Sequence, residues 1–142
     1  SNLSGATFSG DMVSQSTLNI LEKVVPVSIS SDTATCSYAS GAVFYVTGLA
    51  AATNFEALLT NINPASSSTT TCVVSLLIDT STYEAYANTC KVNGTTRSII
   101  FAGGAVDIEG ATKVLQTISM IYSGSATVPI VISSVVPFSA LA

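Results

Sequence analysis

Few residues of this chain could carry out chemistry, because it contains no histidine and only 8% of its residues are charged. Without an imidazole, the Ser-His-Asp and Cys-His arrangements that activate a nucleophile cannot form. The remaining reactive groups are three cysteines, eight carboxylates and five tyrosines. None of them stands in a recognisable motif of nucleophile and base. The sequence therefore predicts that the protein is not an enzyme.

Two carboxylates and two tyrosines are the candidates for contacting a ligand. Asp107 and Glu109 stand two residues apart in a segment flanked by glycines, where they are either solvated loop charges or part of a site for a hard cation. Tyr83 and Tyr86 lie near a predicted turn, where their rings either stack on a sugar or pack as ordinary core residues. We expect the ordinary roles to prevail, so no cofactor and no metal ion is predicted.

The three cysteines allow one intramolecular disulfide bond at most. Cys72 and Cys90 flank a turn predicted at residues 79–82, and a hairpin centred on position 81 would place them opposite one another, close enough for a bridge. The alternative is that both are buried thiols that pack as small apolar groups. Cys36 is left over and is predicted to be buried. Structural zinc is not expected, because it requires four Cys or His ligands, often at closer spacing.

Charge and hydropathy exclude two classes of partner. The net charge is −4, and the four basic residues are scattered singly along the chain, whereas nucleic-acid binding requires a clustered basic face. No apolar run reaches the roughly 18 residues of a membrane-spanning helix. Neither nucleic acid nor membrane insertion is therefore expected. Because 48% of the residues are hydrophobic, we expect the apolar surplus in sheet faces and in contacts between subunits.

Alternation of apolar and polar residues with a period of two predicts short β-strands separated by Ser, Thr, Asn and Gly turns. Asn93-Gly94 is a strong signal for a two-residue hairpin turn. Residues 24–142 are predicted to form an antiparallel β-sandwich or jelly roll of roughly nine short strands. Residues 1–23 are predicted to form an N-terminal arm or assembly segment. The helix candidate is Ser14 to Val24, and the alternative is that the N-terminal residues form an arm that packs on a neighbouring subunit. The predicted strands are 24–29, 33–38, 42–47, 55–62, 72–78, 83–92, 95–101, 113–122 and 128–136.

A series of strand and turn segments between Asn19 and Phe138 suggests a family. The segments include Gly41 to Tyr45 (GAVFY), Asn54 to Ile62, Val74 to Ile78 (VSLLI), Ile99 to Gly104 and Gln116 to Ile121 (QTISMI). In this order they resemble a β-domain of structural proteins in marine bacteriophages, especially cyanophages, and in some algal viruses. The resemblance implies a tail-fibre or appendage protein and favours a trimer, and it transfers no functional residue to this chain.

The expected function is therefore that of a non-enzymatic structural protein of a virion surface assembly, such as a tail fibre, an appendage or a capsid decoration, with a role in host attachment. We expect it on the virion surface or otherwise outside the cell. Its expected partners are further copies of itself, other virion proteins and a glycan on the host surface. Two alternatives remain open. One is a secreted carbohydrate-binding module, and the other is an extracellular filament subunit whose arm adds a strand to its neighbour.

Overall fold

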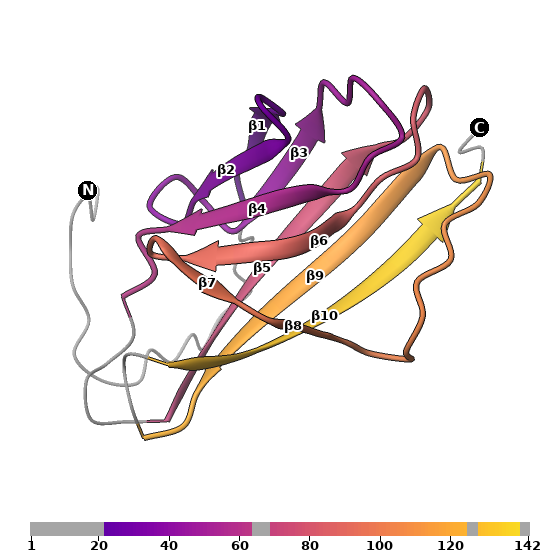
Figure 1. Cartoon of the computed structure of the whole chain (residues 1–142). Coiled ribbons are helices and arrows are strands. Elements are labelled where there is room, and N and C mark those ends of the chain that lie inside the picture. Colours follow the sequence, from indigo (N-terminus) through magenta and orange to yellow (C-terminus); the bar gives the residue numbers. More distant parts are fainter. Residues whose placement is uncertain (1–21, 64–68, 125–127, 140–142) are drawn as a thin grey trace, which may run out of the picture.

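The computed structural model describes residues 22–63, 69–124 and 128–139, and these residues form ten β-strands and no helix (Figure 1). One sheet has six strands in the order β1-β3-β5-β9-β10-β8, and the other has four in the order β2-β4-β6-β7. The strands are β1 (Val24–Ser28), β2 (Thr33–Ser37), β3 (Val43–Thr47), β4 (Phe55–Thr60), β5 (Thr70–Asp79), β6 (Ala87–Val92), β7 (Thr95–Arg97), β8 (Ile99–Phe101), β9 (Lys113–Tyr122) and β10 (Pro129–Phe138).

The first six strands alternate between the two sheets. Strands β1, β3 and β5 pair in parallel in the six-stranded sheet, and β2, β4 and β6 pair in parallel in the four-stranded sheet. The chain therefore winds through three turns of a flattened coil, and each turn adds one strand to each sheet (Figure 1). Between β1 and β2 the chain reverses at Ser31 and Asp32, whose φ angles are 50° and 56°. Ser30 and Thr33 exchange two backbone hydrogen bonds of 3.0 Å across this turn, and Thr33 is the first residue of β2 in the other sheet.

The second half of the chain adds three antiparallel pairs and one parallel pair, that of β8 with β10. Strand β7 follows β6 through a hairpin in the four-stranded sheet, and after Ser98 the same run of chain enters the six-stranded sheet as β8. Strands β9 and β10 have ten residues each, and β9 pairs antiparallel with both β5 and β10 over their whole length. These three long strands give the six-stranded sheet most of its extent.

The two sheets share one hydrophobic core. Strands β4 and β9 alternate buried and partly exposed residues without a break, as strands with one covered face do. Large core side chains come from both sheets, and they include Phe44 and Leu76 from one sheet and Phe55 and Leu59 from the other. Burial of each such side chain contributes roughly 1.5–3 kcal/mol, so this core holds the two layers together.

The predicted strand positions are largely confirmed, with two differences. Strand β6 begins at Ala87 rather than at Tyr83, and the predicted segment 95–101 divides into β7 and β8, so ten strands replace the expected nine. The hairpin turn at Asn93-Gly94 is confirmed, because both residues have positive φ and join the antiparallel strands β6 and β7. The predicted arm over residues 1–23, including the segment from Ser14, lies almost wholly outside the described residues.

The predicted antiparallel pairing is wrong for most of the molecule. Five of the eight strand pairs are parallel, so both sheets are mixed and an antiparallel jelly roll is not confirmed. Side-chain alternation is the same in parallel and antiparallel strands, and it therefore carries no information about direction. The short turns that suggested hairpins instead lead the chain from one sheet to the facing one.

A buried glutamine joins the two sheets by hydrogen bonds. Gln116 on β9 is fully buried, and its side-chain amide lies against Ala87, the first residue of β6 in the opposite sheet. The Ala87 N–H donates to Gln116 Oε1 at 2.8 Å, and Gln116 Nε2 donates to the Ala87 carbonyl oxygen at 2.8 Å. Gln116 Nε2 also donates to Ser133 Oγ on β10 at 3.1 Å. One side chain thus links three strands from both layers.

Gln116 lies against the side of β6 on which Ala87 has no neighbouring strand. The Phe55 N–H donates to the Tyr86 carbonyl oxygen, so the backbone of Tyr86 faces β4. Successive residues of a strand direct their N–H and C=O groups to opposite sides, and those of Ala87 therefore point away from β4. On that side, β7 begins to pair only at Cys90. The amide of Gln116 supplies the donor and the acceptor that a strand would otherwise provide, and it thereby avoids two unsatisfied buried groups.

We expect Gln116→Leu to lower the free energy of unfolding by roughly 2–4 kcal/mol, because both backbone groups of Ala87 would lose their partners in a buried site. Ser133→Ala removes one acceptor only and should cost about 1 kcal/mol. Urea unfolding followed by circular dichroism measures both values. An unchanged unfolding midpoint for Gln116→Leu would show that Ala87 does not depend on this amide.

Candidate functional site

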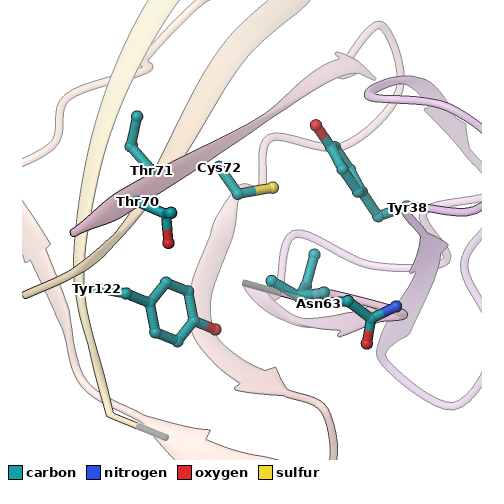
Figure 2. Close-up of a pocket in the computed structure, with 7 residues that line it drawn as sticks. Tyr38, Asn63, Thr70, Thr71, Cys72 and Tyr122 are labelled. Atoms are coloured by element: carbon teal, nitrogen blue, oxygen red, sulfur yellow. The ribbon is translucent and has the colours of Figure 1, made fainter. Parts of the chain in front are cut away.

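A pocket opens between the two sheets at the end where β2 and β4 finish and β5 begins (Figure 2). Its volume is about 230 Å³, below the roughly 300–1,000 Å³ of pockets that hold drug-sized ligands. It therefore has room for a very small molecule or a few waters. The lining residues are Tyr38, Ile62, Asn63, Thr70, Thr71, Cys72 and Tyr122.

Cys72 is the cysteine of this pocket, and its thiol points towards Tyr38 from the facing layer (Figure 2). Burial raises the pKa of the Cys72 thiol, and the hydrogen bond with Tyr38 offsets part of that rise. The same hydrogen bond is the main reason why the pKa of Tyr38 is raised. A nucleophilic cysteine needs a lowered pKa and a base beside it. The geometry therefore does not activate Cys72 as a nucleophile.

The other two cysteines lie in the core, and all three thiols are free. Cys36 on β2 and Cys90 on β6 are almost fully buried, and burial raises the pKa of Cys36 to about 12 and that of Cys90 to about 11. The predicted burial of Cys36 is confirmed. Of the two alternatives for Cys72 and Cys90, the structure has the free thiols and not the bridge, and β5 and β6 belong to different sheets. The hairpin that would have set the two residues opposite one another does not form.

The four candidate ligand residues lie on two loops, 80–86 and 102–112, at the opposite end of β5 from the pocket. The Gly110 N–H donates to Glu84 Oε1 at 2.7 Å and joins the two loops. Within the second loop, the Glu109 N–H donates to Asp107 Oδ1 at 3.1 Å. The fold thus brings the two segments together, although the carboxylates of Glu84 and Asp107 serve to fix the loop backbone.

The two loop tyrosines have different surroundings. The ring of Tyr86 packs edge-on against Phe101, with centroids 5.7 Å apart and planes at 85°, and it belongs to the margin of the core. Tyr83 is 38% exposed. Tyr83 is therefore the more accessible ring of the two. Tyr86 has the packing role that was one of its two expected roles.

Asp79 is the centre of a small polar network at the same end of the molecule. Its carboxylate accepts hydrogen bonds from Ser81 Oγ at 2.7 Å and Ser81 N–H at 3.1 Å, and from Tyr45 Oη at 3.4 Å. Lys113 Nζ lies 3.3 Å from Asp79 Oδ1. The hydrogen bonds from Ser81, with a smaller contribution from Lys113, hold the pKa of Asp79 below its usual value.

The outer faces of the two sheets differ in polarity. On the six-stranded sheet, Val73, Ile100, Ile130 and Val136 are 41%, 58%, 49% and 45% exposed. The six strands of this sheet contain no charged residue except Asp79 and Lys113, which pair at one end. The outer face of the four-stranded sheet is mostly threonine, serine and the ion pair between Lys91 and Glu56, whose atoms lie 3.6 Å apart. One face is therefore polar and the other is largely apolar.

Other kinds of site are not apparent in the described parts of the chain. A second pocket of about 240 Å³ lies between the β1–β2 turn and the β3–β4 connection, and small residues such as Gly48, Ala50 and Ala51 line part of it. Within the described ranges, no three Cys, Asp or Glu side chains gather in a way that could hold a metal ion. The same ranges contain no helix with the length and apolarity to cross a bilayer.

Comparison with known proteins gives no relative for this chain: no family model, no curated protein and no solved structure matches it.

We expect the three thiols to differ in reactivity towards a thiol reagent such as DTNB. In the native protein Cys72 should react first, because it is half-buried at a pocket, while Cys36 and Cys90 lie in the core with strongly raised pKa values. After denaturation without reductant, all three should react. A single reactive thiol under those conditions would contradict the structure and restore the predicted bridge.

We expect the stability of the protein to fall at acid pH partly through Asp79. A carboxyl whose pKa is lowered by folding stabilises the native state above its unfolded pKa, near 3.9, and this contribution is lost as the pH falls through the folded value. Asp79→Asn should therefore flatten the acid limb of a plot of thermal midpoint against pH. Because Ser81 is the larger cause of the shift, Ser81→Ala should flatten that limb more than Lys113→Gln. An acid limb of unchanged slope in all three variants would contradict this assignment.

Proposed function

We propose that this chain is a non-enzymatic structural domain of a virion surface assembly, such as a tail fibre, an appendage or a capsid decoration, and that it takes part in host attachment. The observation that carries the proposal is the apolar, almost uncharged outer face of the six-stranded sheet. A large apolar face exposed to water marks an interaction surface, and an assembling subunit covers such a face with its neighbours. The virion setting is supported by the resemblance of the strand segments to phage structural domains.

The state of the reactive groups supports a structural role. The Cys72 thiol has a raised pKa, and the loop carboxylates of Glu84 and Asp107 accept hydrogen bonds from backbone N–H groups. Two facing sheets around one core further support classification as a β-sandwich with mixed sheets. Sandwiches are a frequent scaffold of viral surface domains.

The carbohydrate-binding alternative receives less support from the geometry. It relies on tyrosines and carboxylates of the two loops, and of these Tyr86 packs on Phe101 while Asp107 caps its own loop. Tyr83 remains as an exposed ring. If a glycan binds here, Tyr83→Ala should abolish the signal on a glycan array without loss of stability, which makes it a cleaner probe than Tyr86→Ala.

Antibodies raised against the purified protein should label the surface of intact virus particles from the source of this sequence in immunogold electron microscopy. The labelling should persist on particles purified by gradient centrifugation, because a structural component remains with the particle. Pre-immune serum is the control. Antigen confined to the particle-free soluble fraction would contradict the proposal and favour the secreted alternative.

A further inference from the structure

We propose that the outer face of the six-stranded sheet is a contact between two copies of this chain, in which the two identical faces pack against one another about a two-fold axis. The inference rests on the proposed role as an assembling subunit. It adds the surface, the partner and the symmetry of the contact.

The strand register arranges the side chains of this face in bands that run across the sheet. One apolar band consists of Tyr45, Leu77, Leu115 and Val136, which are direct register partners on β3, β5, β9 and β10. A second band spans two register rows, with Val73, Ser119, Ile132 and Ile100 as partners in one row and Thr71, Ile121 and Ile130 in the other, so this band is apolar except for Ser119 and Thr71. Between the bands lies a row of small hydroxyl residues, Ser75, Thr117 and Ser134. The apolar side chains thus form two bands separated by a row of hydroxyl groups, rather than isolated exposed residues.

The extent of the face matches what one partner contributes to a stable protein interface. Each residue of a sheet covers about 16 Å² of the sheet plane, given a rise of about 3.3 Å and a strand spacing of about 4.8 Å. Strands β1, β3, β5, β9, β10 and β8 hold 5, 5, 10, 10, 10 and 3 residues, which gives roughly 700 Å². A standard interface buries about 800 Å² on each partner. Two facing sheets also pack readily, as in the two layers of a sandwich.

The charge of the face favours an identical partner. Asp79 and Lys113 are the charged residues of its six strands, and their atoms lie 3.3 Å apart, so the face carries no net charge. Two such faces meet without the repulsion that juxtaposed like charges cause. A strongly acidic or basic partner would find no complementary charge there. A patch that binds its own copy is isologous and closes into a pair.

The edge of the coil formed by β1 and β2 is poorly suited to the alternative of strand exchange. The Ile29 N–H donates to the Thr47 carbonyl oxygen, so alternation directs the nitrogen of Pro26 to the outer side of β1, where proline has no N–H to donate. On the outer side of β2, both backbone groups of Thr33 already bond to Ser30. A strand added to either of these two edges would therefore lack the hydrogen bonds of Pro26 or Thr33, which disfavours strand exchange through β1 and β2.

The proposed symmetry differs from the trimer that the family resemblance favours. A three-fold ring needs two different patches on each subunit, whereas one face that binds itself gives a dimer. Larger assemblies would then be built from such pairs through other surfaces.

Light scattering after size exclusion, over roughly 1–100 μM protein, tests the inference. The wild-type chain should reach twice its mass of 14.4 kDa. Val73→Lys and Ile130→Lys each place a charge in the second band of the face, and we expect the dissociation constant to rise at least about 100-fold, because the new charge would be buried without a partner. Both side chains are exposed in the single chain, so the thermal midpoint at low concentration should not change. Thr35→Lys and Thr89→Lys add the same charge to the outer face of the four-stranded sheet and should leave the dimer intact.

Three outcomes would overturn the inference. A trimer that withstands Val73→Lys and Ile130→Lys would exclude this face and the two-fold axis, while leaving the proposed virion role to the immunogold test. Equal weakening by the face variants and by the threonine controls would show a general charge effect. A wild-type chain that stays monomeric across this concentration range would exclude a second copy of the chain as the partner of this face.

Discussion

The N–H and C=O groups of residues at the ends of the paired strands need hydrogen-bond partners. In a chain with so few charged residues, the structure depends on neutral side chains to provide them. Side-chain amides do much of this work. Gln116 satisfies both backbone groups of Ala87, and Asn93 does the same for Ile62 by accepting from its N–H at 3.1 Å and donating to its carbonyl oxygen at 2.6 Å. Because a neutral amide offers a donor and an acceptor together, it can replace a missing strand without burying a charge. Ala87 begins β6 and Ile62 follows β4, so both amides bind backbone groups at the ends of strands of the four-stranded sheet.

The shared core leaves the outer faces of the sheets free to differ. Every strand gives one set of side chains to the interior, so stability restrains the outward set only weakly. In the four-stranded sheet the outward residues are hydroxyl and charged side chains, such as Thr35, Thr89 and the pair of Lys91 with Glu56. In the six-stranded sheet they are largely aliphatic. This difference in polarity between the two outer faces does not stabilise a single chain. It is the feature of the fold on which the proposed assembly depends.

The polar pockets are minor features by comparison. The cavity beside Cys72 and the loops that carry Tyr83 and Asp107 lie at opposite ends of β5, so they do not combine into one site. In the loops, the carboxylates of Glu84 and Asp107 accept hydrogen bonds from backbone N–H groups, whereas the hydroxyl of Thr70 in the cavity has no hydrogen-bond partner among the described residues.

The sequence by itself determined where the strands lie, because alternation and turn residues are local properties. It also determined the hairpin at Asn93-Gly94, since positive φ at two successive residues restricts their types. The pairing of the strands was decided only in three dimensions. A short turn after β1 can lead to a neighbouring strand or to the facing sheet, and the choice depends on burying a common core with distant residues. For the same reason the hairpin that would have set Cys72 opposite Cys90 does not form, and the expected apolar sheet face could not be located from the sequence. Its bands consist of residues such as Tyr45, Leu115 and Val136, which are far apart in the chain and become neighbours only through the order of the strands.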